Sequence, residues 1–101
     1  MPAYAEPVSS YGFERSEAAD GSHVRIALSG ELDLTNAREL ERRLESACGP
    51  ETSLVVDLNR VSFIDSAALH VFFRLARGCG ERLRILLEPT ASIAYAGHAC
   101  S

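Results

Sequence analysis

Three residue types that could support acyl-transfer chemistry lie close together in the sequence. Asp65, Ser66 and His70 supply a carboxylate, a hydroxyl and an imidazole, and His70 follows Ser66 by about one helical turn. The neighbouring sequence supplies no oxyanion hole, and the chain has no Gly-x-Ser-x-Gly elbow and no glycine-rich phosphate loop. The sequence therefore predicts neither a hydrolase nor a nucleotide-binding enzyme, and the hydroxyl of Ser66 needs another explanation.

Ser66 stands where a predicted strand passes into a predicted helix. Residues 53–58 form an apolar run rich in β-branched side chains, which indicates a strand buried on both faces. A helix is expected from about Ser66 to Arg77, with a buried stripe of Leu69, Phe72, Phe73 and Ala76. Ser66 then lies near the helix N-cap, where free N–H groups and the positive end of the helix dipole would tolerate a phosphoryl group.

Three aspartates lie at or near the ends of predicted strands. Asp33, Asp57 and Asp65 are expected to gather at one edge of the sheet, where α/β proteins bind their ligands. For Asp57 a role in turn formation is preferred. Asp33 is equally well explained as a helix cap or as a contact to a partner.

The cysteines and histidines predict no metal site. Cys48, Cys79 and Cys100 are odd in number and widely spaced, so we expect free structural thiols in a reducing cytoplasm rather than a disulfide framework. A metal site would have to recruit His98 and Cys100, and two ligands are too few.

The composition is that of one small globular domain. The chain has 101 residues, of which 47% are hydrophobic, and its net charge of −4 argues against nucleic acid as a partner. No run approaches the ~20 apolar residues of a membrane span. Residues 1–10 lack the features of a signal peptide and are expected to form a flexible arm, with a single domain over residues 11–101.

The first half of that domain reads as a hairpin followed by a helix. Residues 11–17 and 23–29 are predicted strands joined by a turn at Asp20-Gly21, and Gly30 is expected to end the second. Asn36 with Glu39 resembles a capping box. The helix that follows should bury Ala37, Leu40, Leu44 and Ala47 and stop at Gly49-Pro50.

The second half repeats a strand–helix–strand pattern. After the buried strand we expect a turn near residues 59–60, the helix at Ser66, a helix end marked by Gly78 and Gly80, and a strand over residues 82–88. A last short helix is expected from Thr90 or Ser92 through Tyr95. The fold class is therefore α/β, a small mixed sheet of about four strands flanked by two to four helices.

Two separated motifs resemble those of STAS domains, the family of bacterial anti-sigma factor antagonists. Residues 28–33, Leu-Ser-Gly-Glu-Leu-Asp, followed by Asn36-Ala37, resemble the first motif. Residues 54–58 and 61–66, Leu-Val-Val-Asp-Leu and Val-Ser-Phe-Ile-Asp-Ser, resemble the second. The resemblance covers about residues 11–93 and implies a STAS fold.

The resemblance also implies a cytoplasmic, non-enzymatic switch without a cofactor. In the family the serine after the aspartate is phosphorylated by an anti-sigma factor that is an ATP-using serine kinase, and this position is Ser66. The unmodified protein captures that kinase and frees a sigma factor, and a protein phosphatase resets the switch. A monomer or weak homodimer is expected. The expected partner contacts are Asp33, Asn36, Asp65, Ser66, Ala67, Leu69 and His70.

Two departures from the family pattern have structural consequences. Ala67 and Ala68 replace the usual Ser or Thr and Gly, and alanine predicts a stiffer helix start. The C-terminal helix is shortened, so the core is covered incompletely or by a second copy. STAS domains also occur as cytosolic subunits of lipid-transporting ABC complexes, and this is the alternative function.

Overall fold

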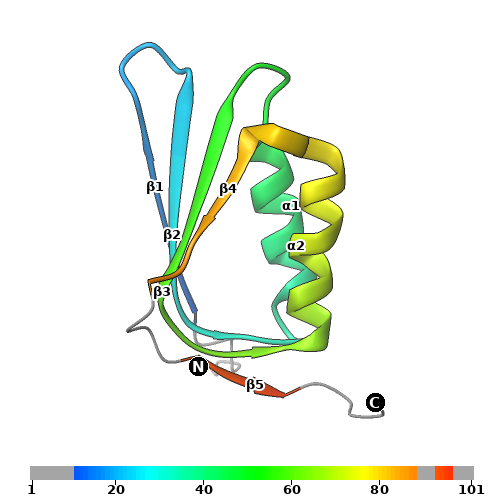
Figure 1. The fold of residues 1–101 in the computed structure, drawn as a ribbon. Coiled ribbons are helices and arrows are strands. Elements are labelled where there is room, and N and C mark those ends of the chain that lie inside the picture. The colour runs from blue at the N-terminus through cyan, green and yellow to red at the C-terminus, as the bar shows by residue number, and fades with distance from the viewer. Residues whose placement is uncertain (1–10, 89–92, 97–101) are drawn as a thin grey trace, which may run out of the picture.

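The described part of the chain forms one mixed sheet with two α-helices on a single face (Figure 1). The computed structural model describes residues 11–88 and 93–96, so the predicted arm at residues 1–10 lies outside the described residues. The strand order is β1-β2-β3-β4, and β5 pairs with β3; β1 and β2 pair antiparallel, and the pairs β2–β3, β3–β4 and β3–β5 are parallel. In chain order the elements are β1 (Tyr11–Glu17), β2 (His23–Leu32), α1 (Ala37–Ala47), β3 (Ser53–Asp65), α2 (Ser66–Cys79), the 3-10 turn η1 (Gly80–Arg82), β4 (Leu83–Leu86) and β5 (Ala94–Ala96).

The predicted hairpin is confirmed. Tyr11 pairs with Gly30 and Glu17 with Val24, and the turn between the strands contains Gly21 at a φ of 75°. Glycine adopts this left-handed conformation without steric cost, which is why Asp-Gly marked the turn in the sequence.

Two predicted strand ends are wrong, because both lie inside longer strands where the register between β2 and β3 shifts. β2 continues past Gly30, which has a φ of 84°, to Leu32, and β3 continues past residues 59–60 to Asp65. Against β2, the register of β3 gains one residue between Ala27 and Ser29 and another between Gly30 and Glu31. Glycine at positive φ and asparagine are common in turns, but here Gly30 lies opposite a bulge of β3 and Asn59 lies within one, so these residues mark irregular pairing and not strand ends.

The core lies between the sheet and the helices. The predicted stripe of α1 is confirmed, since Ala37, Leu40, Leu44 and Ala47 are all buried. For α2 only Phe72 was assigned correctly: the buried residues are Ala68, Val71, Phe72, Leu75 and Cys79. The buried set has the same three- and four-residue spacing as the predicted stripe, but it includes smaller side chains. The prediction favoured the larger apolar residues and therefore selected the wrong face of the helix.

The C-terminal part departs from the prediction in one element. Tyr95 lies in β5, which pairs in parallel with residues 63–65 of β3, and is not helical. Thr90 and Ser92, the predicted starts of that helix, lie outside the described residues. The fold class itself is confirmed as α/β, with a five-stranded sheet and, within the part of the chain that the structure describes, two α-helices.

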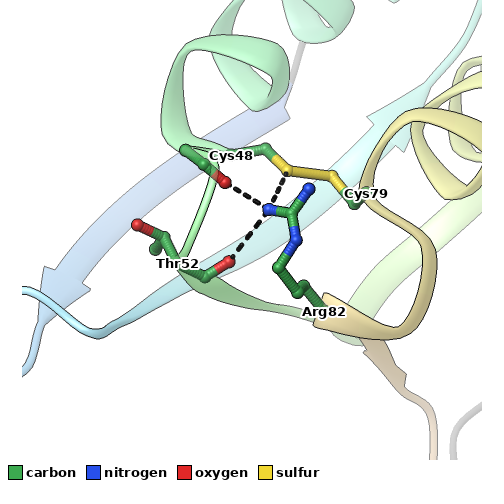
Figure 2. The surroundings of a disulfide bond; sticks show 5 residues. Cys48, Thr52, Cys79 and Arg82 are labelled. Atoms are coloured by element: carbon green, nitrogen blue, oxygen red, sulfur yellow. Dashed lines mark hydrogen bonds between the residues drawn. A yellow bond between two sulfur atoms is a disulfide. The ribbon is translucent and has the colours of Figure 1, made fainter.

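Cys48 and Cys79 form a disulfide, so the prediction of free thiols is wrong for this pair (Figure 2). The two residues are 31 positions apart, and their Cα atoms are separated by 6.6 Å. Both helices connect parallel strands, which brings their C-terminal ends to the same end of the sheet. The inference of a reducing compartment from free thiols loses its support.

Across residues 11–88 and 93–96, none of the helices combines the length and the apolar character needed to cross a membrane.

Candidate functional site

The candidate site lies where β2 and β3 end together. Leu32 pairs with Ile64 at the end of the parallel register, so Asp33 and Asp65 follow at the same edge of the sheet. The structure thus brings these two predicted site residues together. Asp57 is not with them, because it lies within β3 opposite Ala27.

Asp65 connects the start of α2 to the loop before α1. It is the N-cap residue of α2, and its Oδ1 accepts a hydrogen bond of 3.0 Å from the backbone N–H of Ala68. Its Oδ2 accepts a second bond, of 2.9 Å, from the backbone N–H of Leu34. One carboxylate therefore satisfies a free donor at the helix start and fixes the neighbouring loop.

Ser66 is the first residue of α2 and is half-buried. The prediction placed it near the N-cap, and the cap itself is the preceding Asp65. Its backbone stands within the first turn of the helix, where uncompensated N–H groups create a positive potential.

The buried side chain of Asn36 holds the loop at residues 33–36 in place from its inner side. Its side chain is only 2% exposed; Oδ1 accepts a 2.9 Å bond from the N–H of Asp33, and Nδ2 donates one of 2.9 Å to the carbonyl of Glu31. The predicted capping box is wrong, because the Asn36 side chain makes no cap hydrogen bond and Glu39 instead accepts one from the hydroxyl of Tyr11. Asn36 consequently positions the loop and is not accessible as a direct contact.

Asp33 closes the same loop on its outer side. Its Oδ1 accepts hydrogen bonds from both the backbone N–H, at 2.9 Å, and the hydroxyl of Thr35. This is the local turn that a short acidic side chain forms with the backbone two residues later. With Asn36 inside and Asp33 outside, the loop presents Leu34, whose side chain is 74% exposed.

A shallow groove of about 360 Å³ runs between α1 and α2 from this loop. The predicted site residues Ala67 and His70 line it on the α2 side. Its full lining is Leu34, Ala37, Arg38, Glu41, Ala67, His70 and Arg74.

An ion pair bridges the two helices within the groove. Arg74 donates to both carboxylate oxygens of Glu41, from Nε at 2.7 Å and from Nη2 at 2.9 Å. The hydrogen bond from Arg74 lowers the pKa of the Glu41 carboxyl below its ordinary value. Bidentate pairing fixes the guanidinium in orientation, so the groove has a defined polar wall.

The exposed side of α2 extends the surface beyond the groove. The rings of His70 and Phe73 lie 6.1 Å apart, and Phe73 is 58% exposed although the sequence placed it in the core. Leu69, another predicted contact, is half-buried. Hydroxyl, imidazole and aromatic groups thus follow one another along the first two turns of the helix.

Asp57 has a structural role away from the site. It forms an ion pair of 2.5 Å with Arg25 on the adjacent strand, and its Oδ1 accepts bonds from both the backbone N–H and the side-chain amide of Asn59. The backbone bond from Asn59 is the largest cause that lowers the pKa of Asp57, and the charge of Arg25 adds to it. The preferred reading of Asp57 as a local structural residue agrees with this geometry, at a bulge instead of a turn.

Sequence reasoning missed Leu34 and the groove residues of α1. A large apolar residue between the cap-competent Asp33 and Thr35 was the available signal for Leu34. Arg38 and Glu41 belong to a run of charged residues that is typical of a solvated helix face, and only the tertiary packing shows that they border α2.

Solved structures with this arrangement of sheet and helices include three anti-sigma factor antagonists. The one from Mycobacterium paratuberculosis aligns with a TM-score of 0.69 and 21% identity over 81% of this chain and 71% of that chain. A STAS-domain antagonist from Rhodobacter sphaeroides has a TM-score of 0.61 and 18% identity, over 75% of this chain and 85% of its own. The antagonist SpoIIAA in its unphosphorylated form has a TM-score of 0.55 and 18% identity, over 88% and 91%. These likenesses define the class of fold.

The family follows from the sequence match. A family model described as "Mlab, STAS domain" matches residues 16–91, so the chain belongs to the STAS domain family. No curated protein matches the chain.

Proposed function

We propose that this protein is an anti-sigma factor antagonist of the cytoplasm that is switched at Ser66. The unphosphorylated form binds an anti-sigma factor with serine kinase activity and so releases a sigma factor. Phosphorylation of Ser66 ends that binding, and a phosphatase restores it. The protein itself performs no catalysis, and ATP is bound by the partner.

The observation that supports the proposal is the position of Ser66 beside the groove between α1 and α2, next to the exposed Leu34. Ser66 begins α2 directly after its cap, and the next residue, Ala67, lines the groove together with Leu34. A kinase that binds across the groove would have this hydroxyl within its contact area. The likeness to three antagonists of anti-sigma factors supports the same assignment.

The electrostatics of the helix start explain how a phosphate could end binding without unfolding the domain. A phosphoserine carries about −1.5 to −2 charges, which the N-terminus of α2 partly stabilises. The same charge stands next to the carboxylate of Asp65, which already accepts from Ala68 and Leu34. The two anions compete for these N–H groups, so phosphorylation weakens the bond that holds Leu34 and adds a repulsive charge to the contact surface.

The test uses four tagged baits in lysate of the source cell: Ser66→Ala, Ser66→Asp, Ser62→Ala and Ser62→Asp. Ser62 is a matched control, because it is an exposed serine of β3 whose hydroxyl donates to the carbonyl of Gly30. We expect a soluble serine kinase on the Ser66→Ala bait and on both control baits, and its loss from the Ser66→Asp bait. Equal capture by the two Ser66 baits would contradict the switch.

Purified components then sharpen the result. We expect the captured kinase to transfer labelled phosphate to the unmodified chain but not to Ser66→Ala, and Ser66→Asp to bind at least about tenfold more weakly, which corresponds to about 1.4 kcal/mol. Leu34→Ala should weaken binding while leaving the melting temperature nearly unchanged, since the side chain is 74% exposed. Labelling of Ser66→Ala to the same extent would move the modification to another residue.

A subunit of a lipid-transporting ABC complex is the second candidate. The matching family description, "Mlab, STAS domain", names no anti-sigma factor. In this case the exposed Leu34 and Phe73 would contact a transporter subunit whether or not Ser66 is modified. Membrane transporter subunits on both Ser66 baits would establish this function instead.

A further inference from the structure

The disulfide at the opposite end of the helices has the features of a reactive site. We propose that Cys48 and Cys79 form a reversible thiol–disulfide site, in which Cys48 is the attacking thiolate, Arg82 its stabilising cation and Cys79 the resolving cysteine. The exchange partner is a low-molecular-weight thiol or its disulfide. This inference rests on residues remote from Ser66 and does not depend on the proposed function.

Secondary structure holds the two sulfurs in place. Cys48 is the C-cap of α1, where its N–H bonds the carbonyl of Glu45, and Cys79 is the last residue of α2. Their Cα separation of 6.6 Å lies within the range that a disulfide spans. Since both helices pack on the sheet through buried residues, a reduced pair would remain close enough to close again.

The two cysteines differ in their surroundings. Cys79 is only 4% exposed, whereas Cys48 is half-buried. Nη1 of Arg82 lies 3.7 Å from the sulfur of Cys48 (Figure 2). The guanidinium is fixed there because the same nitrogen also donates to the backbone carbonyls of Gly49 and Thr52.

Charge decides which sulfur attacks. A helix C-terminus carries roughly −0.5 charge, so both cysteines stand where a thiolate is disfavoured. At Cys48 this is outweighed by the full positive charge of Arg82 at 3.7 Å, and a cation beside a thiol favours its thiolate. The buried Cys79 is suited to react only with a sulfur already beside it.

A surface cavity gives a small molecule access to this pair. It measures about 200 Å³, and its lining includes Cys48, Cys79 and Arg82 together with Pro50 and Gly78. The cavity opens to solvent between the ends of α1 and α2. Its size admits the thiol end of a small molecule, which is the class of reagent that the site would exchange with.

The reaction proceeds in two balanced exchanges. The Cys48 thiolate attacks one sulfur of a small disulfide RSSR, so that a Cys48–SR bond forms, the S–S bond of RSSR breaks and one RS⁻ leaves. The Cys79 thiol then loses its proton to water and attacks the Cys48 sulfur, which expels the second RS⁻. Overall the two protein thiols are oxidised to one disulfide, and RSSR is reduced to two thiols.

The experiment treats the full reduced chain with oxidised glutathione, in a Cys100→Ser background that leaves only the pair. Mass spectrometry of quenched samples should show a transient adduct of one glutathione on Cys48, which then loses that glutathione on closure and leaves a product two hydrogens lighter than the reduced chain. Cys79→Ser should trap the Cys48 adduct, whereas Cys48→Ser should leave Cys79 unmodified on the same timescale. Faster modification of Cys79, or no closure in the parent chain, would overturn the proposal.

Arg82 is tested through the reactivity of Cys48 in the Cys79→Ser, Cys100→Ser chain. Arg82→Gln removes the cation, so the thiol pKa of Cys48 should rise and the fraction of thiolate should fall. The exchange should slow about three- to fourfold for each unit by which this pKa rises, because a more basic thiolate is also a stronger nucleophile. Arg82→Lys should restore most of the rate. Independently of these variants, the pH profile of Cys48 alkylation with Arg82 present should have its inflection below the ordinary thiol pKa of about 8.5. An inflection at or above that value would refute the role of Arg82.

Discussion

The two ends of the helix pair are built by different means. At the N-terminal end of α2, Asp65 and Asn36 hold the loop at residues 33–36 through hydrogen bonds, and Leu34 remains exposed. At the C-terminal ends, a covalent bond joins Cys48 to Cys79 (Figure 2). Hydrogen bonds can be exchanged for bonds to a phosphate or a partner, whereas a disulfide changes only by redox chemistry. The contrast supports the proposed role of the first end in partner recognition, and it makes the second end a covalent anchor of the helix pair.

Reduction of the anchored end should have the largest effect. The disulfide links residues 31 apart, and in the chain-entropy account a loop of that length contributes about 4 kcal/mol to the free energy of unfolding. We expect urea unfolding of the parent chain in dithiothreitol to show a loss of this order.

Cys48→Ser provides the control for that measurement, because its stability should not respond to dithiothreitol. An equal loss of stability in this variant would mean that dithiothreitol acts on a group other than the Cys48–Cys79 disulfide. The disulfide would then not be the anchor of the helix ends.

Removal of Asn36 should be the most damaging change at the hydrogen-bonded end. Asn36→Ala leaves the N–H of Asp33 and the carbonyl of Glu31 without their buried partner, a loss of about 2–4 kcal/mol in the free energy of unfolding. Urea unfolding measures the loss, and the exposed Arg42→Ala on α1 serves as the matched control. A value no larger than that control would mean that the loop is held without Asn36.

Removal of the Asp65 carboxylate should cost less. Asp65→Ala loses the cap of α2 and the bond to Leu34, together about 2 kcal/mol, because water can replace part of both in a half-buried position. Denaturant unfolding gives the stability, and proteolysis of the loop at residues 33–36 reports its release. Unchanged proteolysis would show that Asp65 caps the helix without controlling the loop.

The Glu41–Arg74 pair, between the two ends, should have the smallest effect, and that effect should depend on pH. Since the folded pKa of Glu41 lies below its ordinary value, its contribution is present above the unfolded pKa of about 4.3 and is lost as the pH falls through the lower folded value. The difference in stability between the parent chain and Glu41→Gln should therefore vanish at acidic pH. Thermal melts at neutral pH and below pH 4 would measure it, and a constant difference would contradict the assignment.

The sequence was sufficient for those elements whose signals are local. The hairpin at Gly21 and the buried stripe of α1 follow from turn chemistry and helical spacing, and both are observed. Ser66 was placed near the start of a helix for the same reason, and it is the first residue of α2.

Features that depend on tertiary neighbours were beyond the sequence. Phe73 and Leu75 both have helical spacing, and only the orientation of α2 on the sheet decides which is buried. Likewise, the distance between Cys48 and Cys79 is set by two helix lengths and a strand register, not by spacing along the chain. Asn36 is a residue type that commonly caps helices, but its side chain is hydrogen-bonded to the carbonyl of Glu31 and the N–H of Asp33 and does not cap α1.

β3 is expected to control how fast the backbone amides of the sheet exchange with solvent. It pairs with β2 from Ser53 to Ile64, with β4 only over residues 54–57 and with β5 only over residues 63–65. If β4 or β5 opens, β3 stays paired with β2, whereas loss of β3 would break the whole sheet. Amide hydrogens that bond β3 to β2 should therefore exchange with deuterium only at the rate of global unfolding. Ser66, the first residue of α2, follows directly on this strand, and Figure 1 shows β3 passing straight into α2. A charge added there would accelerate exchange in the loop at residues 33–36 while the strand amides keep their lifetimes.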